Sequence, residues 1–551
     1  MKSYILILIF LFQIISEAQT MKTVFINGKI FTCDDKNPLA EAVVIESNKI
    51  SFVGSTNDAL KKISLDEANE VIDLNGKLML PGFIDNHVHF INGGLYLLGI
   101  DLRPANSTSE FKQILKDYAE KNPGKWITGG YWDHEKWEIK DYPTKEMIDE
   151  VVPNQPVFVS RLDGHMGVAN SLALKLAGIT KETQSPDGGL IVKDPKTGEP
   201  TGLLKDNAMD FVFNIIPSPS KDEYYQAVLA AFDEAKRLGI TSVQDITFAD
   251  ALEAYQKAKD EGKLTCRIYT RWPIADYKSL VEKGIKVGYG DEYIRMGSLK
   301  AFADGSLGSS TAWFFEKYNQ DTTTYGLPMD IVNDGSLEKW ALDADKNGLQ
   351  LSVHAIGDKA NAYMLDLFEK IIKENPKWDR RFRIEHAQHV RFEDIKRFAE
   401  LGVIPSVQPY HCIDDGVWAE KRIGPERIKY TYPFKSFLES GAKICFGTDW
   451  YVAPLNPLLG IYAAVTRRTL DDKNPDGWIP EQKISVEDAI KCYTINSAYA
   501  SFEENIKGSI EVGKLADLIV LSEDILTIDP VKIKDVEVEM TIFDGKIIYK
   551  K

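Results

Sequence analysis

Residues 80–90 read LPGFIDNHVHF, and this stretch decides the fold because it joins an apolar strand to a pair of histidines. Its first half continues an apolar run that starts at Leu78. Side chains alternate between the two faces of a strand, so His87 and His89 point the same way. Two imidazoles on one face at the end of a strand provide half of a metal site.

The composition is that of an ordinary globular protein. The chain has 551 residues, of which 44% are hydrophobic and 27% are charged. This length accommodates an α/β barrel of about 250 residues with additional domains. The net charge of −16 argues against a nucleic-acid partner or an anionic membrane surface. The five cysteines are scattered along the chain, so neither a disulfide framework nor a zinc ribbon is predicted.

The N-terminus reads as an export signal covering residues 1–18. Lys2 supplies the positive start, and residues 5–15 are apolar apart from Gln13. This apolar segment is too short for a membrane span. We therefore expect a periplasmic or secreted protein with no stable membrane insertion after signal removal. The alternative is that Met21 is the true start of a cytoplasmic protein.

Both ends of the chain are predicted to form one composite β-sandwich. Short alternating segments within 22–78 read as strands, and the Asn-Gly pairs at 27–28 and 75–76 are hairpin signals. Residues 505–551 show the same pattern of short strand-like segments. Neither end is large enough for a core of its own, so we expect the two to combine.

Between these ends, short apolar strands alternate with helical patterns, which predicts βα units around a parallel sheet. With the strand that ends at His89 there are eight strands, the other seven lying at 241–245, 267–270, 297–302, 350–354, 383–386, 404–408 and 444–449. We therefore predict an α/β fold with a (β/α)8 TIM-like barrel built from 79–103 and 225–504. The interval 104–224 is too long for a βα loop and predicts a large insertion or flap after the first barrel strand.

Barrel enzymes build their active sites at the carboxyl ends of the strands. Four of the eight histidines in the chain fall at such ends. The chemically active side chains at predicted strand ends are His87, His89, Lys300, His354, His386 and Asp449. A core histidine bonded to a backbone carbonyl would explain any one of the four, but their coincidence favours a metal site.

At these positions and others the chain resembles the amidohydrolase superfamily, specifically its YtcJ-like branch, amidohydrolase family 3. The segments that carry the resemblance are PGFIDNHVH (81–89), DGH (163–165), KAFADGSLG (300–308), VHAIGD (353–358), IEHA (384–387), SVQP (406–409), GTD (447–449) and KGSIEVGKLADL (507–518). The resemblance covers essentially the whole mature chain. It implies a metal-dependent hydrolase with a barrel and a composite β-sandwich.

The resemblance implies two divalent metal ions, with zinc expected first and iron, manganese or cobalt also suited to mixed nitrogen and oxygen ligands. The two histidines of the opening stretch are implied as ligands of one ion, and His354 and His386 as ligands of the other. Asp449 is implied as a ligand that also handles protons. Lys300 is implied as the bridge, and it must first become a carbamate because an ammonium cannot ligate a cation. The alternative is an unmodified, salt-bridged Lys300 in a mononuclear enzyme.

The mechanistic hypothesis is that a metal-bridging hydroxide attacks a carbonyl polarised by one ion. Asp449 takes the water proton and returns it to the leaving nitrogen. We therefore expect an amidohydrolase that cleaves the C–N bond of an amide or cyclic amide in a small molecule. The alternatives are a mononuclear heterocycle deaminase and, outside the enzymes, a secreted binding protein without turnover. The sequence predicts no oligomeric state.

Eight residues are candidates for the substrate pocket. The family pattern points to Asp163 and His165 in the insertion, where a purely structural Asp-Gly-His turn is the alternative. The other candidates lie just past strand ends or are aromatic; they are Asp304, Gln408, Tyr410, His411, Trp132 and Trp418. The aromatic residues of the insertion suggest an apolar or aromatic substituent on the substrate.

Overall fold

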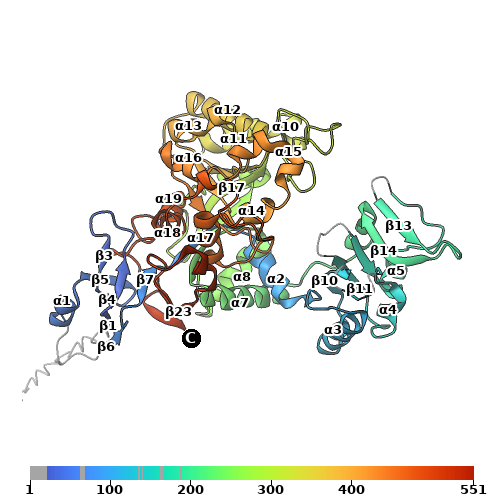
Figure 1. The fold of residues 1–551 in the computed structure, drawn as a ribbon, viewed down its shortest axis with the longest axis horizontal. Coiled ribbons are helices and arrows are strands. Elements are labelled where there is room, and N and C mark those ends of the chain that lie inside the picture. The colour runs from blue at the N-terminus through green and yellow to red at the C-terminus, as the bar shows by residue number, and fades with distance from the viewer. Residues whose placement is uncertain (1–21, 63–68, 135–136, 139–140, 162–165, 187–188) are drawn as a thin grey trace, which may run out of the picture.

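Three parts make up the chain in this computed structural model: a central parallel barrel, a β-sandwich and an inserted αβ unit (Figure 1). The structure describes residues 22–551 apart from 63–68, 135–136, 139–140, 162–165 and 187–188. The predicted export signal, residues 1–18, lies outside the described residues. Within the described part of the chain, no helix combines the length and apolar character needed to cross a membrane.

Eight strands form the barrel, in the sheet order β21-β20-β19-β18-β17-β16-β15-β8. Their bounds are β8 (Phe83–Val88), β15 (Ile240–Ile246), β16 (Arg267–Pro273), β17 (Ile294–Phe302), β18 (Gln350–Ala355), β19 (Arg383–His386), β20 (Ile404–Val407) and β21 (Cys445–Phe446). Each of the seven neighbouring pairs in this order is parallel. The predicted α/β barrel is confirmed, with each strand within a few residues of its expected place.

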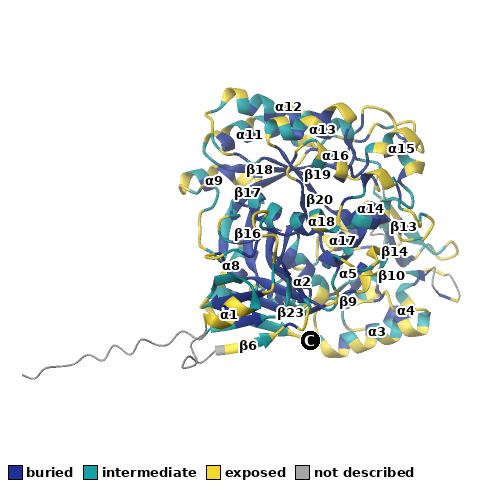
Figure 2. Ribbon diagram, turned by 60° about the vertical axis from the view of Figure 1, so that its left-hand side comes forward, coloured by how far each residue is buried: buried dark blue, intermediate teal, exposed yellow. Residues whose placement is uncertain are grey.

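Amphipathic helices surround the barrel strands. Figure 2 shows buried strands at the centre and exposed residues mainly on the outer surfaces of helices. One example is α7 (Lys221–Arg237), which starts with a capping box between Ser220 and Glu223 and buries Val228 and Phe232. The other helices of this part are α2 (Phe90–Leu98), α8 (Ala249–Asp260), α9 (Tyr277–Glu282), α10 (Asp330–Asn333), α11 (Ser336–Lys346), α12 (Asp358–Glu374), α13 (Phe392–Leu401), α14 (Pro409–Asp415), α15 (Ala419–Arg427), α16 (Phe434–Glu439), α17 (Pro457–Thr466), α18 (Val486–Cys492) and α19 (Ile495–Ala500).

The barrel closes between β8 and the segment that follows β21. The backbone N–H of Asp449 donates to the carbonyl of His87 over 2.8 Å, and the N–H of His89 donates to the carbonyl of Trp450 over 2.9 Å. Gly447 permits this approach because a Cβ there would lie 2.5 Å from the backbone nitrogen of His87. Closure therefore brings the first and last barrel strands, far apart in the sequence, into direct contact.

The predicted composite β-sandwich is confirmed. One sheet has the order β5-β4-β1-β6, and the other, β24-β23-β22-β7-β2-β3, combines strands from both chain ends. The bounds are β1 (Lys22–Ile26), β2 (Lys29–Phe31), β3 (Leu39–Ala40), β4 (Ala42–Glu46), β5 (Lys49–Gly54), β6 (Asn69–Asp73), β7 (Leu78–Pro81), β22 (Leu518–Leu521), β23 (Val538–Phe543) and β24 (Lys546–Lys550), with α1 (Thr56–Lys61) alongside. A single apolar cluster contains Phe25 from the first sheet and Leu518 from the second. Because β7 pairs with β22, this part extends to residue 81 rather than 78.

The two Asn-Gly pairs do not form the predicted hairpins. β1 and β6 lie in one sheet, while β2 and β7, which follow the turns at 27–28 and 75–76, lie in the other. Asn27 and Asn75 do adopt left-handed backbone conformations, with φ values of 53° and 49°. The Asn-Gly pairs determine where the chain turns, but burial of the apolar faces determines which strands pair. Each turn therefore leads the chain from one sheet to the other.

The predicted insertion after the first barrel strand is also confirmed. Its six-stranded sheet has the order β13-β14-β12-β11-β10-β9 and lies apart from the barrel strands in Figure 1. The bounds are β9 (Ile100–Asp101), β10 (Ile127–Trp132), β11 (Val157–Arg161), β12 (Met166–Ala169), β13 (Gly189–Lys193) and β14 (Pro200–Asp206), with α3 (Thr108–Lys121), α4 (Lys145–Asp149), α5 (Ser171–Leu176) and α6 (Asp210–Phe213). It begins before residue 104 because β9 already belongs to its sheet.

A buried ion pair joins the barrel to the sandwich. The Nε and Nη2 atoms of Arg267 on β16 lie 2.6 and 3.0 Å from the two carboxylate oxygens of Asp517. Arg267→Ala would leave that carboxylate buried without its partner, so we expect the free energy of unfolding to fall by about 3–5 kcal/mol. Urea denaturation measures the change. The exposed pair Arg237–Glu234 provides the control, and Arg237→Ala should cost less than about 1 kcal/mol. Equal losses in the two variants would contradict the prediction.

Candidate metal centre

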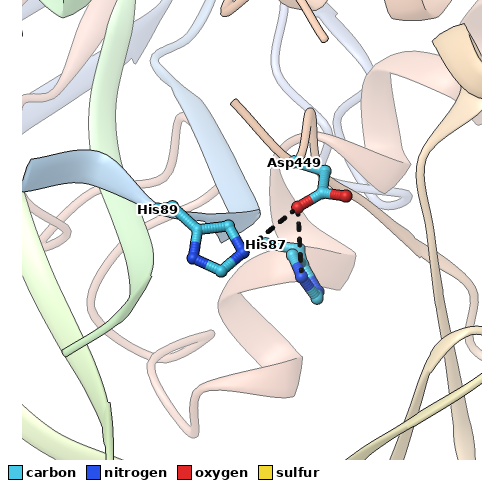
Figure 3. Close-up of side chains that lie close together, drawn as sticks. All are labelled: His87, His89 and Asp449. Atoms are coloured by element: carbon cyan, nitrogen blue, oxygen red, sulfur yellow. Dashed lines mark ion pairs between the residues drawn. The ribbon is translucent and has the colours of Figure 1, made fainter. Parts of the chain in front are cut away.

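Two histidines and one carboxylate converge at the mouth of the barrel. The Nε2 atoms of His89 and His87 lie 3.4 and 3.6 Å from the same oxygen, Oδ1, of Asp449 (Figure 3). The potential ligand atoms of the three residues all lie within 4.8 Å of one another. Donor atoms about 2.1 Å from a tetrahedral ion would be ~3.4 Å apart, so this spacing fits one divalent ion.

The other predicted ligands lie beside this cluster. The ring centroid of His386 is 4.8 Å from that of His87 and 4.5 Å from that of His354. The sheet register accounts for the contact between His354 and His386, because His354 on β18 pairs with Glu385 on β19, the residue before His386. All six predicted ligands line one cavity of about 380 Å³.

Hydrogen bonds determine which ring nitrogens of the second pair are available. His386 donates through Nδ1 to Oε1 of Gln408 over 2.7 Å, and His354 donates through Nε2 to the carbonyl of Gly305 over 3.0 Å. A histidine that donates through one ring nitrogen presents the lone pair of the other, which is the arrangement of metal-bound histidines. Nε2 of His386 and Nδ1 of His354 are therefore the nitrogens suited to a metal.

Burial keeps three of the imidazoles neutral, those of His87, His354 and His386. It lowers the pKa of His87 and that of His354 to about 3, with the nearby ammonium of Lys300 contributing, and it takes the pKa of His386 well below the usual value. Burial tends to raise the pKa of Asp449, but its contacts with His411 and His89 hold that pKa well below the usual range. Neutral imidazoles and an ionised carboxylate are the forms that ligate divalent metals.

Lys300 is a buried amine without a partner. Its side chain is buried, and Nζ has no hydrogen-bond acceptor among the described residues. Burial lowers the pKa of this amine to about 7; the carboxylate of Glu385 opposes the change and the guanidinium of Arg271 adds to it. Near neutral pH the neutral amine, which is the nucleophilic form, is therefore well populated.

Glu385 is the main residue of this centre that the sequence reasoning missed. It accepts a short hydrogen bond from Nδ1 of His87, leaving Nε2 of that ring toward Asp449. Its other oxygen lies 2.8 Å from Arg271 and 2.9 Å from Arg383. The two charged residues at alternate positions of β19 were the available signal, because side chains two apart share one face of a strand.

Two of the predicted pocket residues line the cavity. Nε2 of His411 lies 3.4 Å from Oδ2 of Asp449, the oxygen turned away from His87 and His89. Trp418 contributes an aromatic wall. Asp163 and His165 lie outside the described residues, so their predicted roles remain predictions.

The other four predicted pocket residues are not among the described residues that line the cavity. Trp132 is enclosed in the core of the insertion, where its indole N–H donates to the carbonyl of Val159 over 2.9 Å. Gln408 is buried behind His386, and Tyr410 packs against the barrel core. Neither lines the cavity. Polar or aromatic residues just after a strand can therefore stabilise the end of the strand instead of lining the substrate cavity.

Asp304 is the fourth of these residues. Its buried carboxylate accepts hydrogen bonds from three backbone N–H groups, those of Trp313, Ile356 and Gly357. These bonds tie the loop after β17 to the loop after β18. Asp304 thus shapes the rim of the barrel and does not line the cavity.

The cavity has further walls that the sequence did not indicate. They are formed by Phe302, Gln388, Asp414, Asp415 and Tyr432. Phe302 ends β17 within the segment KAFADGSLG. The other four come from separate loops and helices, and they lie outside the segments that carry the resemblance.

A barrel with this set of histidines, carboxylate and buried amine at its mouth defines the class of metal-dependent hydrolases. The sequence profile of the Amidohydrolase family matches residues 70–549. The chain belongs to this family.

Individual relatives agree with this assignment. The chain is 39% identical to Protein LONG AFTER FAR-RED 3 of Arabidopsis thaliana, over 90% of this chain and 86% of that protein. It is 34% identical to the putative amidohydrolase YtcJ of Bacillus subtilis, over 96% and 100% of the two chains. It is 26% identical to the N-substituted formamide deformylase of Arthrobacter pascens, over 97% and 99%. Among solved structures, an uncharacterized metal-dependent hydrolase from Pyrococcus furiosus matches with a TM-score of 0.77 and 31% identity, over 92% and 100%. These relatives support a hydrolase acting on carbon–nitrogen bonds.

Proposed function

We propose that this protein is a binuclear metal-dependent amidohydrolase that cleaves the C–N bond of an amide or cyclic amide in a small molecule. The observation that carries the proposal is the convergence, in one cavity, of four imidazoles, the Asp449 carboxylate and the unpartnered amine of Lys300. The likeness to an N-substituted formamide deformylase favours an N-substituted amide as the substrate.

The residues present fit two divalent ions. His87, His89 and Asp449 would hold one ion, for which their spacing is suitable. His354 and His386, through the ring nitrogens left free by their hydrogen bonds, would hold the second. Lys300 would lie between the two sets as a carbamate, formed when its neutral amine attacks carbon dioxide and loses a proton. The carbamate oxygens would supply the ligands that an amine in this position lacks.

Zinc is the first expectation for both ions, with iron, manganese and cobalt also compatible with these ligands. The ions, when bound, supply a Lewis acid for the substrate carbonyl and lower the pKa of water toward neutrality, which provides the nucleophile. Asp449 accepts the proton of this water and returns it to the leaving nitrogen. Its position suits the task, because Oδ1 faces His87 and His89 while Oδ2 faces His411.

A mononuclear heterocycle deaminase is the second candidate. The observation in its favour is that His87, His89 and Asp449 alone complete a three-ligand set. In that case Lys300 would remain an unmodified amine. A binding protein without turnover would be a third outcome, and it would require that the intact ligand set hold no metal.

Elemental analysis of protein purified without chelators tests the proposal, together with hydrolysis of a panel of N-substituted formamides, acetamides and cyclic amides. We expect about two metals per chain, complete loss of hydrolysis after removal of the metals, and recovery when zinc and bicarbonate are added. Loss of activity without loss of fold, checked by circular dichroism, separates a catalytic role of the metals from a structural one. One metal with release of ammonia from a heterocycle would favour the deaminase, and no metal even after reconstitution would favour the binding protein.

A further inference from the structure

The cavity has a second polar region, one helical turn away from the metal centre. Helix α14 carries His411, which faces Asp449, and four residues later Asp415. Residues four apart lie on the same side of a helix, about 5–6 Å from each other at Cβ. Both side chains line the cavity, together with Asp414. The same cavity therefore holds the metal centre and, one turn further along α14, two carboxylates.

Asp415 is held in place through only one of its oxygens. Oδ2 accepts hydrogen bonds from the hydroxyl of Tyr432 and from Nε2 of Gln388, each over 2.6 Å. Within the described part of the chain, Oδ1 has no hydrogen-bond partner. Burial raises the pKa of Asp415 to about 6, so the carboxylate is ionised at neutral pH. A fixed, charged acceptor is thus left open toward the cavity.

Among the described residues that line the cavity, Asp415 has no lysine or arginine beside it. Among the described residues that line it, Lys300 is the sole lysine or arginine, and it lies in the metal centre. Arg422 lies 5.4 Å from the ring centroid of Trp418 and donates to the hydroxyl of Ser310 over 2.7 Å, but it does not line the cavity. The imidazole of His411 also lines the cavity, but it lies 3.4 Å from Oδ2 of Asp449, and among the described residues no hydrogen bond joins it to Asp415. A cation that pairs with Oδ1 of Asp415 would therefore come with the ligand.

We propose that the substrate carries a cationic nitrogen, an alkylammonium or amidinium, whose N–H donates to Oδ1 of Asp415 while the scissile carbonyl lies at the metal centre. The apolar walls formed by Phe302, Leu307 and Trp418 enclose the short spacer between these groups. This inference rests on the proposed function, because it takes the metal centre as the place of the carbonyl. It makes anionic N-acyl compounds, such as N-acyl amino acids, poor ligands, since two carboxylates repel them.

Three matched probes test the charge preference without turnover. They are N-(3-aminopropyl)methanesulfonamide, N-butylmethanesulfonamide and N-(methylsulfonyl)-β-alanine, which are cationic, neutral and anionic and whose sulfonamide group resists hydrolysis. Their affinities for the metal-loaded protein are measured by calorimetry. A charge-assisted hydrogen bond predicts that the cation binds about tenfold or more tightly than the neutral probe. The anion should bind most weakly.

The Asp415→Asn variant tests how much the negative charge of Asp415 contributes to binding of the cationic probe. The amide oxygen of Asn can still accept from Tyr432 and Gln388, so the fold is expected to persist, while the amide NH2 turned toward the cavity no longer accepts. The advantage of the cationic probe should fall to less than about threefold. Glu420→Gln removes an exposed carboxylate that does not line the cavity, and it should leave the advantage unchanged.

The outcomes distinguish this inference from the proposed function. The corresponding three acetamides are assayed for hydrolysis in parallel. Hydrolysis without a preference for the cation retains the hydrolase and overturns the inference, as does a preference that persists in Asp415→Asn. Tight cation binding that depends on Asp415, with no hydrolysis of any amide, supports the inference and counts against the hydrolase. Equal binding of the three probes, or binding by none, overturns the inference.

Discussion

Asp449→Asn is expected to lower kcat/KM for amide hydrolysis by about 100- to 10,000-fold, the range of positioned general acid–base catalysis. The substitution is nearly isosteric and keeps one oxygen within reach of the Nε2 atoms of His87 and His89, which lie 3.6 and 3.4 Å from the present carboxylate oxygen. The amide cannot accept the proton of the attacking water. It also loses the negative charge that faces His411 on the other side.

Metal content decides how this loss is interpreted. If the Asp449→Asn variant keeps its metals, the missing proton acceptor accounts for the fall in rate; if it loses one ion, ligation is the dominant role of Asp449. Asp366→Asn on α12 is the control, because that carboxylate is exposed and pairs with Arg397 at the surface, so kcat/KM should stay within about threefold. An Asp449→Asn enzyme with the rate of the wild type would remove Asp449 from the mechanism.

Lys300→Ala should reduce the bound metal from two ions to one per chain and lower kcat/KM by about a thousandfold. The second ion of the proposed binuclear centre would contribute several kcal/mol of charge stabilisation, and each ~1.4 kcal/mol is a factor of ten in rate. Unfolding is not the expected cause, because within the described part of the chain the amine makes no hydrogen bond that the substitution could break. Lys300→Met, which keeps most of the volume, checks the effect of the space left by Ala.

Two measurements test the carbamate directly. Wild-type protein incubated with carbon-13 bicarbonate should show a protein-bound carbamate resonance that both variants lack. Short carboxylic acids such as propionate should partly restore metal binding and activity to Lys300→Ala, since they can place a carboxylate in the space left by the side chain. Two metals in the Ala variant, or no carbamate signal in an active wild type, would contradict the binuclear assignment.

The sequence predicted those features that depend on local periodicity. Apolar strands of the right length, each followed by a helical pattern, were enough to number the eight barrel strands, and placing His354 or His386 required only knowing where a strand ends. A parallel barrel then collects those ends at one face. The fold and the six candidate ligands could therefore be predicted from the order and spacing of residues along the chain.

Features that depend on long-range packing were not predicted. An aromatic residue such as Trp132 looks the same in sequence whether it fills a core or walls a pocket, and the insertion has its own core to fill. The role of Asp304 depends on backbone N–H groups of distant loops. Glu385 interacts with His87 across the barrel, a contact that only closure creates.

Because the barrel closes between β8 and the segment after β21, a bound metal ion would also affect the stability of the barrel. His87 and His89 precede this junction and Asp449 follows it, so one ion would tie the first barrel strand to the last. Binding of the ion would lower the free energy of the closed barrel relative to an open one, because a ligand stabilises the state that binds it. The ion would therefore act as a removable cross-link. Its loss would loosen the last strand of the barrel and would also abolish hydrolysis.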